Sequence, residues 1–276
     1  MTSGSRPKGP SGHVCWSYDD PATLDARARE YLLAGLAVGE RVQYASAEPA
    51  GDVVRRWSAD PRLREALRTG AAEVVSIADT YGDGTVDPTA QVAVYAAMTD
   101  AALADGHTGL RVVAEASSLV RTAAQRETFT RYEHLVDRFM RGRPMSAACA
   151  YDRRLLDDRA VEELASVHPA ADPGSTLFHL HAAEQVDGRL VLTGELDTSN
   201  QELFATTLRR VDPEPGGTEL VLDGDGLRFV DYRSLVHLHR HAERRGTTVL
   251  LRTTLGPAAR LVELLGLRGI RVETIR

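Results

Sequence analysis

Short apolar runs alternate with helical patterns along this chain, and this alternation limits the possible folds more than any other feature. The first apolar run, 13–18, is followed by a helical pattern that starts at Asp20-Pro21 and ends near Leu36. Further strands are predicted at 42–45, 73–77, 109–114 and 145–150, with helices between them. Strands joined by helices form parallel sheets that are buried on both faces. The N-terminal part is therefore predicted to be α/β, with helices on both faces of a parallel sheet.

Two domains are predicted from the chain length and from one change in composition. The 276 residues suffice for two ordinary domains, each with its own core. Residues 1–12 are rich in Gly, Ser and Pro and are expected to be disordered. Residues 168–174, His-Pro-Ala-Ala-Asp-Pro-Gly, have the composition of a linker. The expected domains are therefore 13–167 and 175–276.

One stretch of the second domain, 219–246, predicts a strand, a loop and a helix with a well-defined start. The apolar run 220–222 reads as a buried strand, and a second short apolar segment follows at 227–230. Asp231 stands just before a helical pattern, where its carboxylate can accept hydrogen bonds from free backbone N–H groups. Gly246 suits a left-handed helix end. The start of this helix is expected to be exposed.

These residues resemble the STAS domain, the fold of anti-sigma factor antagonists. Its motif is an apolar strand, an Asp, two small hydroxyl residues and a Gly that leads into a helix. Asp231 matches the Asp, Tyr232 the first hydroxyl position, Arg233 the position that is phosphorylated in the family, and Ser234 the Gly. The resemblance implies a mixed sheet with helices on one side, and an anti-sigma factor that is also a serine kinase as partner.

The departure from the STAS motif at Arg233 changes the expected regulation. Arginine cannot accept a phosphate, so we expect the domain to be constitutively competent for its partner or to be switched by the N-terminal domain. Ser234 is the alternative acceptor. A second match, 189–200, contains a Gly-x-Leu-Asp turn in which Asp197 is expected to cap a helix, and Asp197 and Thr198 join the predicted partner-binding residues. The resemblance covers roughly 175–276.

The N-terminal part resembles the MEDS domain, a bacterial and archaeal sensory module related to RecA-like folds. The matching residues are His13-x-Cys15-x-x-Tyr18, Gly39-Glu40, Arg111-Val-Val-Ala-Glu115, Tyr132-Glu133 and Cys149-x-Tyr151-Asp152, within about 11–160. The resemblance implies a RecA-like sheet and a sensing role, with hydrocarbon derivatives as the proposed ligand class. The predicted ligand-sensing residues are His13, Cys15, Tyr18, Glu115, Glu133, Cys149, Tyr151 and Asp152.

Glu115 is the predicted floor of the sensing pocket. It ends a strand, and open α/β sheets bind ligands beyond the carboxyl ends of their strands. Tyr18 and Tyr151 are the expected walls. The alternative is that Glu115 caps a helix or pairs with Arg121.

A metal or redox sensor is the competing interpretation of the first domain. His13 and Cys15 alternate onto one strand face, and Cys149 lies in a strand that could neighbour it. Three candidate ligands without a Cys-x-x-Cys pair are weak support, and free cysteines usually behave as small buried apolar residues. No metal and no cofactor are therefore expected.

Several functional classes are disfavoured by the sequence. A P-loop requires Gly-x-x-x-x-Gly-Lys-Ser/Thr, and the only lysine, Lys8, lies in the predicted tail. Nucleotide hydrolysis is therefore disfavoured, whereas nucleotide binding without hydrolysis stays an alternative. No Gly-x-Ser-x-Gly motif is present, and no enzyme activity is expected. The net charge of −6 argues against nucleic acid as a partner. Without a signal-peptide pattern or a long apolar run, the expected location is the cytoplasm with no membrane contact.

The sequence thus predicts a signalling protein that couples a small-molecule ligand to binding of an anti-sigma factor. A nucleotide-binding RecA-like protein and a metal or redox sensor, each with a STAS output domain, are the alternatives. A homodimer is one option for the oligomeric state.

Overall fold

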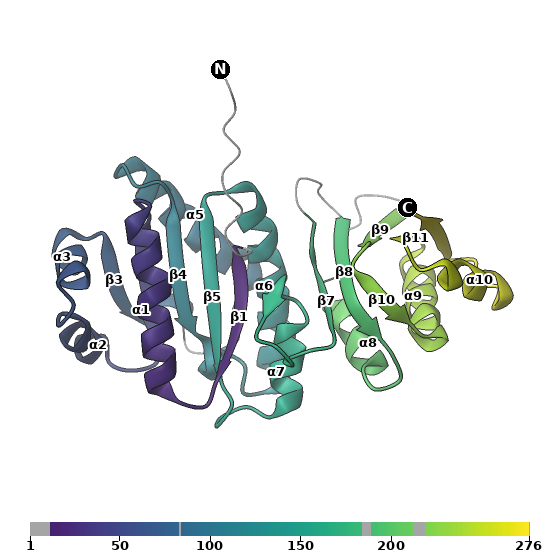
Figure 1. Ribbon diagram of the computed structural model, residues 1–276, viewed down its shortest axis with the longest axis horizontal. Coiled ribbons are helices and arrows are strands. Elements are labelled where there is room, and N and C mark those ends of the chain that lie inside the picture. Colours follow the sequence, from purple (N-terminus) through teal and green to yellow (C-terminus); the bar gives the residue numbers. More distant parts are fainter. Residues whose placement is uncertain (1–11, 83, 184–188, 212–218, 276) are drawn as a thin grey trace, which may run out of the picture.

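A computed structural model of this chain describes residues 12–82, 84–183, 189–211 and 219–275. The predicted disordered tail, 1–12, lies outside these residues except for Gly12. Figure 1 shows two sheets arranged one after the other along the long axis, with the N-terminal half on the left and the C-terminal half on the right.

The first sheet has six strands in the order β3-β2-β4-β5-β1-β6. Its strands are β1 (His13–Tyr18), β2 (Arg41–Ser46), β3 (Ala72–Ser76), β4 (Leu110–Glu115), β5 (Met145–Asp152) and β6 (Ala170–Ala171). Every neighbouring pair is parallel. The predicted parallel sheet is confirmed.

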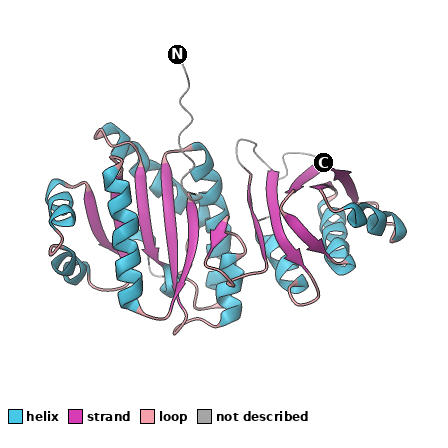
Figure 2. Cartoon of the chain, in the orientation of Figure 1, coloured by secondary structure: helices cyan, strands magenta, loops and turns pink. Residues whose placement is uncertain are grey.

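Helices cover both faces of the first sheet, as predicted (Figure 2). One face packs against α1 (Pro21–Ala37), α2 (Ala50–Trp57) and α3 (Pro61–Thr69). The other packs against α5 (Pro88–Ala104), α6 (Ala123–Gly142) and α7 (Asp158–Ala165). Two short elements, α4 (Ile77–Tyr81) and the 3-10 helix η1 (Ala116–Leu119), follow β3 and β4.

Helix α6 begins at Ala123, well before its first buried residue, Phe129. The hydroxyl of Thr122 accepts a hydrogen bond from Gln125 N at 3.1 Å, and the Gln125 side chain accepts one from Thr122 N at 3.0 Å. This capping box satisfies N–H groups that the first helical turn leaves free. The local polar residues therefore set the helix start, and the apolar face begins later.

The second sheet is mixed. Its parallel strands run in the order β10-β8-β9-β11-β12, and β7 pairs antiparallel with β8. The strands are β7 (Phe178–Ala182), β8 (Arg189–Leu196), β9 (Glu219–Gly224), β10 (Leu227–Val230), β11 (Thr248–Thr253) and β12 (Ile270–Thr274). Helices α8 (Gln201–Arg210), α9 (Tyr232–Arg245) and α10 (Gly256–Leu264) contribute to one apolar core with them. Alternate residues of β8 are buried, which is typical of a sheet covered on one face.

The segment 168–174, predicted as a linker, packs on the first sheet instead. Val14 and Cys15 of β1 pair with Ala170 and Ala171 of β6. The carboxylate of Asp172 binds the Arg27 guanidinium at 2.7 Å. Composition could not reveal this, because the partners lie about 150 residues away in the chain.

The two halves contact each other through α6, α7, α8 and β7. Strand β7 lies beside α6 in Figure 1, and the backbone N–H of Ala182 donates to the Asp137 carboxylate at 3.1 Å. The Arg210 guanidinium donates to the carboxylate of Glu163 at 2.9 Å. Polar groups from both halves therefore share one buried boundary.

Candidate functional site

Strand alternation places the predicted sensing residues on opposite faces of the first sheet. Tyr18, Glu115 and Asp152 lie on the α1 face or at its carboxyl edge. His13, Cys15, Cys149 and Tyr151 lie on the α6 face, where α6 contributes Glu133. Because successive side chains of a strand point to opposite faces, one pocket cannot contain them all. The expectation that Tyr151 and Tyr18 line the same pocket is therefore wrong.

Glu115 is the centre of the group on the α1 face. The carboxylate accepts a hydrogen bond of 2.6 Å from the Tyr44 hydroxyl and one of 3.2 Å from the Ser46 hydroxyl. Glu115 makes no capping hydrogen bond to η1, against the alternative that it caps a helix. Burial raises the pKa of Glu115, and it also raises that of Tyr44, next to the same carboxylate. The carboxyl ends of β2 and β4 thus bring a buried carboxyl group, Glu115, together with the hydroxyl groups of Tyr44 and Ser46.

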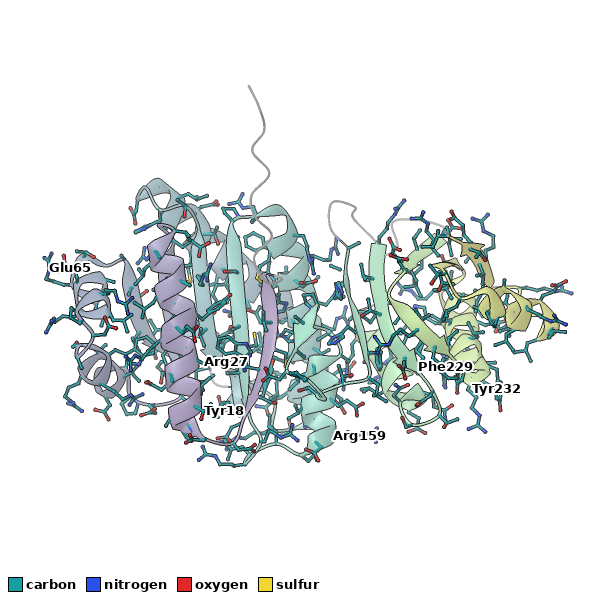
Figure 3. The ribbon with its side chains drawn as sticks, in the orientation of Figure 1. Tyr18, Arg27, Glu65, Arg159, Phe229 and Tyr232 are labelled. Carbon is teal, nitrogen blue, oxygen red and sulfur yellow. The ribbon has the colours of Figure 1, made fainter. Side chains whose placement is uncertain are left out.

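A cleft of about 280 Å³ opens at the end of β1, on the α1 face. Trp16, Tyr18, Asp20 and Arg27 line it, and Figure 3 shows Tyr18 and Arg27 near the same end of the sheet. The guanidinium carbon of Arg27 lies 4.2 Å from the centre of the Trp16 ring. An aromatic wall with a cation and a phenol suits a small polar organic ligand.

Asp152 has a structural role at the carboxyl edge of the first sheet, and its carboxylate is already paired. Its carboxylate binds the Arg154 guanidinium at 2.6 Å, and its backbone N–H donates to Ser117 Oγ at 2.8 Å. The hydrogen bond from Arg154 lowers the pKa of Asp152. Ser117 thereby holds the end of β5 against η1.

A second group, on the α6 face, is fully enclosed. His13, Glu133, Cys149 and His168 have ligand-type atoms within 4.8 Å of one another, and each side chain is 3% exposed or less. His13 Nε2 lies 3.0 Å from Glu133 Oε2, and Cys149 Sγ lies 3.5 Å from the same oxygen. His168 Nε2 is 3.6 Å from it. We call these four residues the His-Glu-Cys-His cluster.

A shell of polar groups orients the His-Glu-Cys-His cluster. The Tyr151 hydroxyl donates to Glu133 Oε1 at 2.6 Å. Asp137 Oδ1 lies 3.5 Å from His13 Nδ1. His168 Nδ1 lies 2.8 Å from the carbonyl oxygen of Leu164, which can only accept, so Nδ1 carries a proton.

Charges inside the cluster shift its pKa values strongly. Burial lowers the pKa of His13, but the carboxylates of Asp137 and Glu133 outweigh burial and raise it to about 9. Burial would raise the pKa of Glu133, whereas the imidazoles of His168 and His13 and the Tyr151 hydroxyl lower it to about 2. Burial lowers the pKa of His168 to about 4. Glu133 is thus a carboxylate and His168 a neutral imidazole.

Sequence reasoning missed part of both groups. His168 was assigned to a linker, and Tyr44 and Ser46 carried no signal beyond strand periodicity. Asp137 could have been found, because it stands four residues after Glu133 and shares its helix face. Cys15 was proposed with Cys149, and the two lie directly opposite each other in neighbouring strands, but Cys15 lies outside the His-Glu-Cys-His cluster.

The predicted partner-binding residues lie in two places. Asp231 caps α9 by accepting a hydrogen bond of 2.7 Å from Ser234 N, as predicted. Beside this cap Phe229 is 50% exposed and Tyr232 is 48% exposed, and both are labelled in Figure 3. The Arg233 guanidinium donates to the Tyr232 hydroxyl at 3.0 Å. We call Phe229, Tyr232 and Arg233 the α9 start patch.

Ser234 and Asp197 differ from the expectations. Ser234 is fully buried, and its hydroxyl has no hydrogen-bond partner among the described residues, so the native fold does not present it to a kinase. Asp197 does not cap α8, because Asn200 precedes the helix and Asp197 accepts hydrogen bonds from Ser199 instead. Thr198 lines a groove of about 450 Å³ together with α7 residues, including Arg159.

Comparison with protein families matches residues 12–169 to MEDS, described as the MEthanogen/methylotroph, DcmR Sensory domain. No curated protein matches the chain. The matched segment begins just before β1 and ends one residue after His168, so it includes both groups of the first sheet. Within the described ranges, no helix combines the length and apolar character needed to cross a membrane.

Proposed function

The chain belongs to the MEDS sensory-domain family, and from this we propose that it is a signalling protein whose N-terminal half senses a small molecule and whose C-terminal half binds an anti-sigma factor. The family supports the sensory role. The partner is inferred from the resemblance of the second half to STAS domains. In this proposal the chain acts by binding and not as an enzyme.

The α9 start patch is the observation that carries the partner-binding proposal. Phe229 and Tyr232 are two half-exposed aromatic residues next to a capped helix start, and Arg233 adds a cation. Exposed aromatic and arginine side chains are the residues that most often dominate the binding energy of protein interfaces. A patch of this kind suits a protein partner better than a small ligand.

Control by phosphorylation of the second half is not part of the proposal. The motif position carries Arg233, which cannot be phosphorylated, and Ser234 is buried under the first turn of α9. A phosphate on Ser234 would place about two negative charges in the core beside Asp231. Regulation is therefore assigned to the N-terminal half, through the buried boundary between the two halves.

The proposed ligand site is the cleft at the end of β1, with Tyr18 and Arg27 in its wall. Glu115 is not among the residues that line the cleft, but its charge, after burial, raises the pKa of Tyr18 in the wall, and its carboxylate accepts hydrogen bonds from the hydroxyls of Tyr44 and Ser46. These groups can donate and accept hydrogen bonds, which suits a small oxygen-containing organic ligand.

The test is binding of the full chain to anti-sigma kinases of the source organism by isothermal titration calorimetry. Phe229→Ala and Tyr232→Ala should each weaken binding roughly tenfold, because truncating a central aromatic residue of an interface costs on the order of 1–2 kcal/mol. Leu264→Ala is the matched control, since Leu264 is 71% exposed on α10. Unchanged affinity in both aromatic variants, or phosphate transfer to Ser234 of the native protein, would refute the proposal.

A further inference from the structure

We propose that His13, Glu133, Cys149 and His168 bind one divalent transition-metal ion, with Zn²⁺ as the best fit, inside the N-terminal domain. The proposal concerns the α6 face of the sheet and stays independent of the α9 start patch and its partner.

The spacing of the four ligand atoms agrees with a tetrahedral site. Zinc bonds of about 2.0–2.3 Å to nitrogen, oxygen and sulfur place tetrahedral ligand atoms roughly 3.3–3.7 Å apart. His13 Nε2 is 3.8 Å from Cys149 Sγ and 3.0 Å from Glu133 Oε2. Glu133 Oε2 is 3.5 Å from Cys149 Sγ and 3.6 Å from His168 Nε2. Small side-chain shifts would bring all four atoms around one ion.

The surrounding hydrogen bonds have the pattern of a metal site. Metal-binding histidines usually donate their second ring N–H to a carboxylate or a backbone carbonyl, which fixes the tautomer and the ring orientation. His168 donates Nδ1–H to the carbonyl of Leu164, and His13 has Asp137 beside its Nδ1. Once His13 has released its Nε2 proton, both Nε2 atoms can offer a lone pair to an ion at the centre of the cluster. Tyr151 supplies the hydrogen bond that orients Glu133.

A bound metal ion gives every ligand atom of the cluster a partner, whereas a protonated His13 does not. Without a metal, a protonated His13 can bridge Glu133 and Asp137. That arrangement leaves His168 Nε2 fully buried with no hydrogen-bond partner among the residues described. An unpaired buried polar atom costs roughly 1–3 kcal/mol. Metal coordination gives this nitrogen a partner and uses the other three side chains as well.

The donor set also indicates the kind of metal and its role. Two imidazoles, one thiolate and one carboxylate suit Zn²⁺, and harder ions such as Mg²⁺ prefer oxygen alone. On binding, Cys149 loses its thiol proton and His13 its Nε2 proton to solvent, and the thiolate and the Glu133 carboxylate together balance the charge of the ion. Four protein ligands, from β1, α6, β5 and the loop that follows α7, close the site. A structural or regulatory ion therefore fits better than a catalytic one.

The experiment uses the full chain without a polyhistidine tag, stripped of metal by a chelator and titrated with Zn²⁺ or Co²⁺. We expect one ion per chain by elemental analysis, and Co²⁺ absorption bands of a tetrahedral site with a sulfur-to-cobalt charge-transfer band. Cys149→Ser should lose that charge-transfer band. Cys15→Ser is the matched control, because Cys15 is equally buried and lies opposite Cys149 in the neighbouring strand, and it should keep the band.

Two results overturn the assignment. The first is that the folded wild-type chain neither retains nor takes up stoichiometric metal. This result can be interpreted without any variant. The other is a charge-transfer band that persists in Cys149→Ser or disappears in Cys15→Ser. If Cys149→Ser does not fold, His168→Gln replaces it. This variant should bind Zn²⁺ at least tenfold more weakly and lose the increase in thermal midpoint that Zn²⁺ gives the wild type, and undiminished binding contradicts the site.

Discussion

Arg210 offers the sharpest test of how the two halves are held together. Its guanidinium lies at the boundary, 6% exposed, and donates to Glu163 at 2.9 Å and to Glu127 at 2.8 Å. The side chain of the neighbouring Arg209 is 59% exposed and, among the described residues, pairs with Glu127 alone, at 3.4 Å. We predict that Arg210→Met destabilises the protein strongly and that Arg209→Met does not, although both remove the same charge.

The size of the effect follows from what each variant leaves behind. Removing one partner of a buried ion pair costs roughly 3–5 kcal/mol, because the remaining charge stays buried. Glu163 keeps Arg126 at 3.2 Å, so its charge is not left alone, and the expected cost of Arg210→Met falls below that range, to about 2–3 kcal/mol. Methionine retains an unbranched chain and avoids a large cavity. An exposed pair such as that of Arg209 contributes at most about 1 kcal/mol.

The chain provides a built-in probe for this test. Its two tryptophans, Trp16 and Trp57, both lie in the N-terminal half, so fluorescence reports that half, whereas far-UV circular dichroism reports both halves. In urea, the two signals should coincide for the wild type and Arg209→Met, and separate for Arg210→Met. Equal midpoints for the two variants, or coincident signals in Arg210→Met, would show that the boundary does not depend on this buried pair.

Three further predictions concern single residues. Burial raises the pKa of Glu115, so the contribution of this residue to stability is fully present below the unfolded-state pKa near 4.5 and is lost as pH rises through the folded-state pKa. Glu115→Gln should lack this loss when thermal midpoints are compared with those of the wild type above pH 4.5. Gly194→Ala should lower the free energy of unfolding in urea by about 3 kcal/mol or more, because φ is +91° and the new Cβ would overlap the carbonyl of Leu177. Gly70→Ala is the control: φ is +79° but the Cβ would enter open space, so the loss should be about 1 kcal/mol. Asp231→Ala should lower the free energy of unfolding by about 1 kcal/mol and Asp231→Asn by less than half of that, and equal losses would argue against the capping hydrogen bond.

The fold was predictable where the relevant information is local. Apolar runs between helical patterns determine the parallel first sheet, and Asp231 determines where α9 begins, since a carboxylate at that position caps the nearest free N–H groups. Pairing between distant segments was not predictable. The two residues of β6 look like linker sequence, and only their contact with β1 makes them a strand.

The candidate site shows the same limit. Cys149 and Tyr151 belong to one strand face by alternation, and Glu133 and Asp137 belong to one helix face by spacing, so these pairs can be read from the chain. Their contact with His168 cannot be predicted from the sequence, because it requires the loop that follows α7 to fold back over β1. A sequence therefore identifies the ligand-type residues on each element and leaves open which elements meet.

A series of contacts connects the His-Glu-Cys-His cluster to the α9 start. Asp137 faces His13 on one side and accepts from the backbone of Ala182 in β7 on the other. Strand β7 pairs with β8 along five residue pairs, and Leu196 at the end of β8 accepts a hydrogen bond from Asp231 N at 2.9 Å. Continuity alone does not produce coupling, because both ends must favour different arrangements of a shared element. Strand β7 contacts Asp137 on one side and pairs with β8 on the other, and β8 carries the contact to Asp231. A signal from the first half can reach the α9 start by this route only if β7 has two positions against α6, one with ligand bound and one without. If β7 has the same position in both states, the contact between α7 and α8 is the remaining route.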